Sequence, residues 1–188
     1  MRYFNYLLLV ALLGSLQGCF PVIATGVGTG ALMAADRRTT GIYIEDEAIE
    51  NKALSQVSAK YNNITHVNIT SFNRNVLITG EAPNEAAKAD ITKIVSAVPN
   101  VKAVNNELAI SGLTGITSRS SDSIITGDVK LRFMSNKTFQ ADHIKVITEN
   151  GTVFLMGLVY RKEAESATEI ASTTKGVQRV VKVFEYLD

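Results

Sequence analysis

The sequence predicts an α+β chain with two tandem copies of one small module, each ordered helix, strand, strand, helix, strand. Three observations support this fold class. Residues 46–188 repeat at a nearly constant shift, helix-like apolar stripes alternate with β-rich runs in both copies, and turn residues separate these elements. Each copy is therefore expected to form a three-stranded mixed sheet packed by two helices.

The first 18 residues have the features of an export signal rather than of a folded element. Arg2 provides the positive start, an apolar run covers residues 7–13, and Gly14-Ser15 begins the cleavage region. That apolar run is too short to span a bilayer. The next four residues, LQGC at 16–19, resemble the bacterial lipobox, in which the cysteine is lipidated after cleavage.

Cys19 is the single cysteine of the chain. A lone cysteine in an exported protein can also form an intermolecular disulfide or remain a free thiol. Its position at the end of a signal peptide favours lipidation, and two or more acyl chains are enough for stable anchoring. Phe20 follows it rather than the aspartate that, by resemblance, retains lipoproteins in the inner membrane. We therefore expect a lipid anchor in the outer membrane, on the periplasmic face.

The charge balance argues against nucleic-acid binding. The whole chain has 19 basic and 18 acidic residues, and removal of the signal takes away Arg2 but no acid. The mature chain thus lacks the basic excess that nucleic-acid binding requires. Attraction to an anionic surface would have to come from a local patch.

Residues 19–45 are expected to form the lipidated N-terminus and a flexible tether. Residues 21–35 are small, apolar and rich in glycine, with no charged side chain. The glycines of residues 26–30 resemble a nucleotide-binding loop, but no strand–helix–strand context surrounds them. A tether is the better interpretation.

The repeat divides the rest into a first module at 46–112, a linker at 113–121 and a second module at 122–188. Residues 66–80 match residues 143–157 at a shift of 77, and later apolar positions match at a shift of 76. Two copies are too few for a solenoid, so each module must bury a core of its own. The linker is rich in Ser, Gly and Thr.

Helix stripes and hairpin signals place the elements of both modules. Ile49, Ala53 and Val57 form the first apolar stripe, at a spacing of four. In the first module the further elements are strands at 64–71 and 76–81, a helix at 84–98 and a strand at 101–110. In the second module Asn150-Gly151 lies between two apolar runs, which is the strongest short signal for a hairpin.

The apolar strand, then Gly80 or Gly157, a helix and a Val-x-x-Val pair together resemble the BON domain. Residues 148–159 are the most specific stretch, and two such modules behind a lipobox resemble the dual-BON outer-membrane lipoproteins. That resemblance implies a non-enzymatic protein that supports envelope integrity, localises to division sites and binds anionic phospholipid through its second module. These functions are implications of the resemblance.

The first helices of the two modules differ on the face opposite the core. In the second module Ile125, Val129 and Phe133 form the core stripe, while Ile124 and Leu131 lie roughly opposite it. The sequence therefore predicts phospholipid contact at five residues of this helix: Ile124, Gly127, Lys130, Leu131 and Met134.

Two further observations bear on that predicted lipid-binding face. Arg132 and Lys137 are expected as additional cations on the same helix, and the matching face of the first helix carries Ala48, Asn51, Ser55 and Ser58. The alternative is that Ile124 and Leu131 pack against the other module or the tether.

No cofactor, metal site or catalytic constellation is expected. His66 and His143 occupy equivalent positions, but neither has a nearby cysteine or a repeated carboxylate spacing, so a structural or surface role is favoured. The acidic residues 45–47 are expected just before a helix, where they complement its dipole. No serine lies in a Gly-x-Ser-x-Gly turn, which disfavours a hydrolase.

Two functions remain open at this stage. The first is a lipid-anchored module that binds anionic membrane phospholipid. The second is an adaptor for envelope assembly or peptidoglycan-remodelling proteins, which would bind through exposed strand edges.

Overall fold

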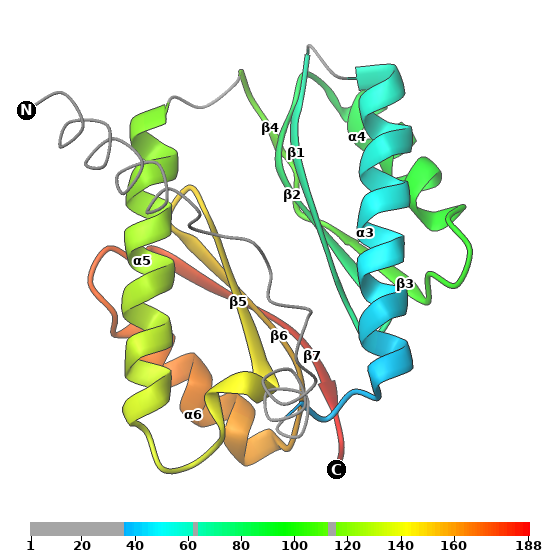
Figure 1. Ribbon diagram of the computed structural model, residues 1–188. Coiled ribbons are helices and arrows are strands. Elements are labelled where there is room, and N and C mark those ends of the chain that lie inside the picture. Colours follow the sequence, from blue (N-terminus) through cyan, green and yellow to red (C-terminus); the bar gives the residue numbers. More distant parts are fainter. Residues whose placement is uncertain (1–35, 62–63, 113–115) are drawn as a thin grey trace, which may run out of the picture. The chain divides into compact units, whose positions relative to one another are not determined.

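The computed structural model describes residues 36–61, 64–112 and 116–188 (Figure 1). Residues 35–188 form one compact unit that contains both modules. The first module consists of α3 (Thr40–Tyr61), β1 (His66–Phe72), β2 (Asn75–Ala82), α4 (Glu85–Ser96), β3 (Ala103–Asn106) and β4 (Ala109–Ile110). The second consists of α5 (Ile116–Ser135), the 3-10 turn η1 (Ala141–His143), β5 (Ile144–Glu149), β6 (Thr152–Val159), α6 (Arg161–Ser172) and β7 (Arg179–Tyr186).

Both sheets are mixed, as the sequence predicts. In each module the first two strands are antiparallel, and the strand that follows the second helix pairs parallel to the central strand. In the first module the last strand is divided into β3 and β4, which both pair with β2. Two helices cover one face of each sheet (Figure 1). The α+β class and the tandem arrangement are confirmed.

Helix α3 begins earlier than the sequence indicates. It starts at Thr40, so residues 40–45 are helical, although the sequence places them in the tether. The acidic residues 45–47 accordingly lie inside the helix, and their expected role just before a helix is wrong. Asp46 is instead buried against the sheet, and its side chain has a different function.

A helix carboxylate holds the hairpin turn in each module. Asp46 accepts hydrogen bonds from the backbone N–H groups of Asn73 and Arg74, at 2.8 and 2.7 Å. Asp122, the equivalent residue of α5, accepts from Asn150 and Gly151 at 2.8 Å each. All four turn residues have positive φ, so their N–H groups point away from the strand ladder and need an acceptor.

The glycines of the repeated pattern are required by a close backbone approach. A Cβ atom at Gly80 would lie 2.0 Å from the carbonyl oxygen of His66, and one at Gly157 would lie 2.5 Å from that of His143. Any side chain would therefore force the antiparallel pair apart. Glycine at this point of the central strand keeps the hairpin closed in both modules.

Each module has its own apolar core between its helices and its sheet. In the first, Ile49, Ala53 and Val57 of α3 pack with Val76 and Ile78 of β2. In the second, the core stripe of α5 packs with the equivalent β6 residues and with three alanines of α6: Ile125, Val129, Phe133, Val153, Leu155, Ala164, Ala167 and Ala171. The helix stripes predicted from the sequence are confirmed as core.

A third cluster joins the two modules. Phe72 and Leu77 of the first sheet pack with Phe154 and Met156 of the second, and all four are buried. Because strand residues alternate between faces, these side chains lie on the faces opposite the helices. The central strands β2 and β6 are consequently buried on both faces, which explains the consecutive apolar residues at 76–78 in β2 and 153–156 in β6.

The segment just before α3 contacts both modules. Arg37 donates two hydrogen bonds to the carboxylate of Glu163 at the start of α6, at 2.7 and 2.8 Å. Arg38 pairs with Asp46 at 2.8 Å, and its guanidinium lies 4.0 Å from the centre of the Phe72 ring. Two neighbouring arginines thus connect the segment just before α3 to the second and the first module.

The Arg37–Glu163 pair predicts a pH dependence of stability. The hydrogen bonds from Arg37 hold the pKa of Glu163 below its ordinary value. The stabilisation that ionised Glu163 gives to the folded state is therefore fully present above the ordinary glutamate pKa. It is lost as the pH falls through the lowered pKa that Glu163 has in the folded state. Glu163→Gln should cost about 1–2 kcal/mol of unfolding free energy at pH 7.

Urea unfolding at several pH values checks this expectation. Glutamine still accepts the hydrogen bond from the Tyr160 N–H that begins α6, so the substitution changes mainly the charge. The difference between the variant and the wild type should shrink between about pH 5 and about pH 3. A difference that stays constant over this range would show that the ion pair does not contribute.

Candidate functional site

Helix α5 positions the residues that the sequence predicts for lipid contact. Helix α5 lies beside the sheet of β5, β6 and β7 (Figure 1). Its core stripe packs against that sheet, and Val129 and Phe133 are almost completely buried. With 100° per residue, Ile124, Leu131 and Met134 lie roughly 140–160° around the helix from Val129 in the middle of the stripe, so they turn away from the sheet. Burial of one face therefore determines which side chains the other face presents.

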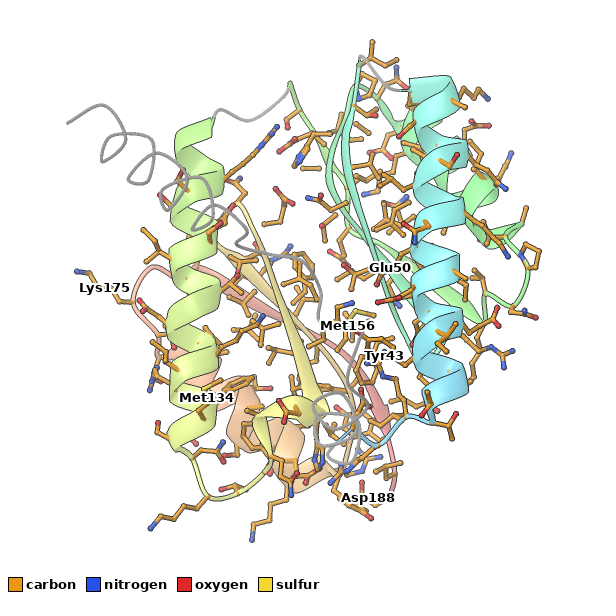
Figure 2. The ribbon with its side chains drawn as sticks, viewed as in Figure 1. Tyr43, Glu50, Met134, Met156, Lys175 and Asp188 are labelled. Carbon is orange, nitrogen blue, oxygen red and sulfur yellow. The ribbon has the colours of Figure 1, made fainter. Side chains whose placement is uncertain are left out.

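The face of α5 opposite the core is apolar and exposed. Ile124, Leu131 and Met134 have 66%, 65% and 70% of their surface accessible, and Figure 2 labels Met134 on this helix. Gly127 lies between them in the helical projection, and a Cβ added there would contact nothing within 4 Å. We refer to Ile124, Gly127, Leu131 and Met134 as the α5 ridge. A ridge of this kind on a surface helix is unusual for a domain that acts alone in water.

The cations near the α5 ridge are fewer than the sequence suggests. Lys130 borders the ridge and is exposed, and Lys137 is exposed just beyond the helix. Arg132, by contrast, donates to the carbonyl oxygen of Ile170 at 2.7 Å and to the hydroxyl of Thr174 at 2.6 Å. Its guanidinium is used to tie α5 to the end of α6, so it is not available to a ligand.

A model of the BON domain matches residues 45–112 and residues 121–188. The chain belongs to the BON-domain family. Its two BON domains correspond to the two modules described above, and the dual-BON architecture implied by the sequence resemblance is confirmed.

Several curated proteins are similar to this chain. The outer membrane lipoprotein DolP of Haemophilus influenzae is 40% identical over 185 residues, which cover 96% of each chain. The 21 kDa hemolysin of Actinobacillus pleuropneumoniae is 32% identical and covers 81% of this chain and 79% of its own. The osmotically-inducible protein Y of Escherichia coli is 22% identical over 83% of this chain and 80% of its own.

The first BON domain lacks an equivalent of the α5 ridge. The matching positions of α3 carry alanine, asparagine and serine, as the sequence shows. Three other large hydrophobic side chains are nevertheless exposed on α3: Tyr43 at 38%, Ile44 at 60% and Leu54 at 43%. Ile44 and Leu54 lie ten residues apart, and none of the exposed large hydrophobic residues of α3 lies between them, whereas Leu131 lies between Ile124 and Met134 on α5. Sequence comparison of the two helices did not single out this pair.

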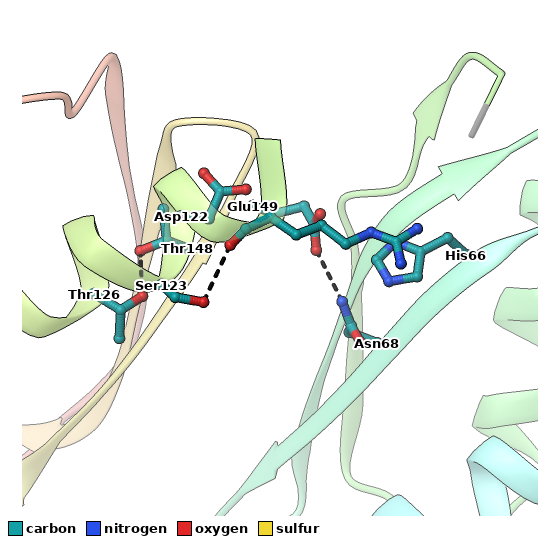
Figure 3. A pocket seen from close by; sticks show the side chains of 8 residues that line it. His66, Asn68, Asp122, Ser123, Thr126, Thr148 and Glu149 are labelled. Atoms are coloured by element: carbon teal, nitrogen blue, oxygen red, sulfur yellow. Dashed lines mark hydrogen bonds between the residues drawn. The ribbon is translucent and has the colours of Figure 1, made fainter. Parts of the chain in front are cut away.

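A polar pocket of about 410 Å³ lies elsewhere, beside β1 and β5 (Figure 3). It is lined by His66, Asn68, Arg119, Asp122, Ser123, Thr126, Thr148 and Glu149. The Asn68 amide donates to the Glu149 carboxylate at 2.9 Å, and the Thr126 hydroxyl donates to that of Thr148 at 2.7 Å. In the sequence His66 is an isolated histidine. In the fold it lies close to the carboxylates of Glu81 from the first domain and Glu149 from the second.

Cys19 and the predicted signal peptide lie outside the described residues. Among the helices that the structure describes, none combines the length and the hydrophobicity needed to cross a bilayer.

Proposed function

We propose that the chain is an outer-membrane lipoprotein that binds anionic phospholipid through α5 of its second BON domain. Cys19 would anchor it on the periplasmic face, and its role would be to support envelope integrity, including at division sites, without enzymatic activity. The observation that carries the lipid-binding part is the α5 ridge, whose three apolar side chains are exposed along one line of the helix. The name of the Haemophilus influenzae relative supports the location.

The α5 ridge has the arrangement that interfacial binding needs. A helix that lies in the plane of the membrane inserts its outward apolar side chains to the acyl boundary and keeps its ends in the headgroup region. Lys130 beside the ridge and Lys137 after it would then meet lipid phosphates. Gly127 leaves the centre of this face flat, which allows the helix backbone to approach the headgroups.

The expected affinity of the ridge alone is modest. Full burial of an Ile, Leu or Met side chain is worth about 1.5–3 kcal/mol, so three partly buried side chains contribute roughly 5 kcal/mol. That corresponds to a Kd on the order of a millimolar to a tenth of a millimolar. A lipid anchor on the same chain would raise the local concentration and make such weak contacts effective.

Vesicle co-sedimentation of residues 20–188, which lack the lipidated cysteine, tests the proposal. The protein should bind vesicles that contain an anionic phospholipid and bind purely zwitterionic vesicles much less. Changing Lys130 and Lys137 together to Gln should weaken anionic binding by roughly 10–30-fold at low salt, since each cation near such a surface is worth about 1 kcal/mol. This loss should diminish as salt is added.

Lys93 provides the matched control for the lysine pair. It is an exposed lysine on α4 of the first BON domain, far in sequence from the α5 ridge. Lys93→Gln should leave vesicle binding unchanged. Equal binding to anionic and zwitterionic vesicles, with no effect of the lysine pair, would contradict the electrostatic part of the proposal.

A second candidate function is that of a protein adaptor. Among the described residues β7 pairs with β6 alone, so its other edge offers backbone groups to an added strand. A groove of about 500 Å³ between α6 and β7, lined in part by Thr168, Lys182 and Tyr186, lies beside it. Protein that ignored all vesicles but cross-linked to an envelope protein through β7 would favour this function.

A further inference from the structure

We propose that His66, Glu81 and Glu149 form a site for a divalent transition-metal ion of the zinc class, which connects the two BON domains. His66 and Glu81 belong to the first domain, and Glu149 belongs to the second. The proposal is independent of lipid binding and uses a different part of the molecule.

The three side chains are close enough to share one ion. One ligand atom of each residue, an imidazole nitrogen or a carboxylate oxygen, lies within 4.8 Å of those of the other two. The Nδ1 atom of His66 is 3.2 Å from a carboxylate oxygen of Glu81. Tetrahedral zinc with bonds of about 2.1 Å places its ligands about 3.4 Å apart, so this pair already has the required separation.

Strand pairing holds two of the ligands rigidly. His66 and Glu81 are cross-strand partners at the open end of the hairpin of β1 and β2. Glu149 is the last residue of β5, and its carboxylate is oriented by the Asn68 amide at 2.9 Å. Ligands on paired strands need little ordering when an ion binds, and a hydrogen bond to a ligand carboxylate is the usual second support of a metal site.

Comparison of the two domains shows that Glu81 is not required by the fold. His143 is the repeat equivalent of His66, but Leu158 stands where Glu81 stands in the first domain. The Glu81 side chain is only 3% exposed, and its carboxylate lies 3.2 Å from the Nδ1 atom of His66. The first domain therefore has a buried carboxylate beside its histidine at a position where the second domain has leucine.

Solvent and ions can reach this cluster. The pocket of about 410 Å³ is lined by His66, Glu149 and Asn68, which point into it in Figure 3. It leaves room for a water molecule as a fourth ligand. Arg119 also lines this pocket, and its side chain is exposed to solvent. One imidazole with two carboxylates suits zinc and similar ions better than magnesium, which prefers oxygen ligands alone.

Calorimetric titration of the mature chain in detergent micelles with zinc chloride tests the site. One Zn²⁺ ion should bind per chain. His66→Ala and Glu149→Gln should each lower the affinity by at least about 10–100-fold, because even indirect supports of a metal site have effects of this size. Cobalt provides a second readout, since Co²⁺ bound by these ligands should give a visible absorption band that both variants lose.

His143→Gln is the matched control, because this histidine has the equivalent place in the second domain, where Leu158 stands at the position of Glu81. It should bind zinc like the wild type. Glu149→Gln retains an oxygen that can accept from Asn68, so it tests the ligand even if His66→Ala unfolds the first domain. The proposal is overturned if zinc does not bind saturably, or if Glu149→Gln binds zinc and cobalt as the wild type does.

Discussion

Changing Ile124 and Leu131 to aspartate is expected to abolish the co-sedimentation of residues 20–188 with anionic vesicles. Both side chains are about two-thirds exposed on α5 and contact neither the sheet nor the core of the second BON domain. Aspartate removes their transfer energy, roughly 3–6 kcal/mol for the pair, and adds charges that anionic lipid repels. Binding should therefore fall by at least about 100-fold, while the circular dichroism spectrum stays unchanged.

The first BON domain offers a matched control for this experiment. Ile44 and Leu54 are exposed apolar residues of α3, and their double change to aspartate introduces the same charges at a surface without a continuous ridge. This control variant should bind vesicles like the wild type. Undiminished binding of the α5 variant would refute the assignment of the ridge. Equal losses in both variants would show that net charge, and not the position on α5, determines binding.

Asp46→Ala is expected to lower the free energy of unfolding by about 3–5 kcal/mol. Asp46 is 2% exposed and accepts hydrogen bonds from the Ser71 hydroxyl and from two N–H groups of the β1–β2 turn. It also pairs with Arg38 at 2.8 Å. Alanine would leave these buried donors without their acceptor, and the loss of one partner of a buried ion pair is among the costliest single changes.

The equivalent change in the second domain, Asp122→Ala, gives a reference value for the loss of unfolding free energy. Asp122 accepts from the N–H groups of Asn150 and Gly151, whereas Asp46 also pairs with the guanidinium of Arg38. Asp122→Ala should therefore cost less, about 1–3 kcal/mol. Urea unfolding of both variants, with Asp46→Asn as an intermediate case, measures the difference. An Asp122→Ala variant as unstable as Asp46→Ala would show that the pairing with Arg38 adds nothing.

Local patterns were enough to predict the elements and the α5 ridge. A stripe at a spacing of four identifies the buried face of α5, and the fixed rotation per residue then assigns Ile124 and Leu131 to the opposite face. The Asn150-Gly151 turn is equally local, because positive φ at both positions selects these residue types. Such predictions succeed because they depend on neighbours within one element.

The partners of Arg132 cannot be predicted from spacing within one helix. By sequence it is one more cation beside the α5 ridge, but the packing of α5 on α6 places the last carbonyl and hydroxyl groups of α6 within its reach. A helix C-terminus attracts cations, so the structure uses this arginine as a cap. The partner is decided by the contact between two helices, which the sequence of either helix does not contain.

The repeat itself contains a signal for the two carboxylates that bind the hairpin turns, Asp46 and Asp122. Asp46 and Asp122 occupy the same position at the shift that aligns the two core stripes, and both are buried. A matched pair of acids on two apolar helix faces indicates a shared structural task. Which groups they bind, however, depends on the hairpins that fold against the helices.

The sequence of this protein therefore determines its repeated α+β modules, their core stripes and the outward ridge of α5, because each follows from spacing within a single element. Tertiary structure decides how Phe72, Leu77, Phe154 and Met156 join the two sheets. It also decides which acids surround His66. Both arrangements bring together residues from different strands, often from different domains, and chain folding sets these distances where sequence spacing cannot.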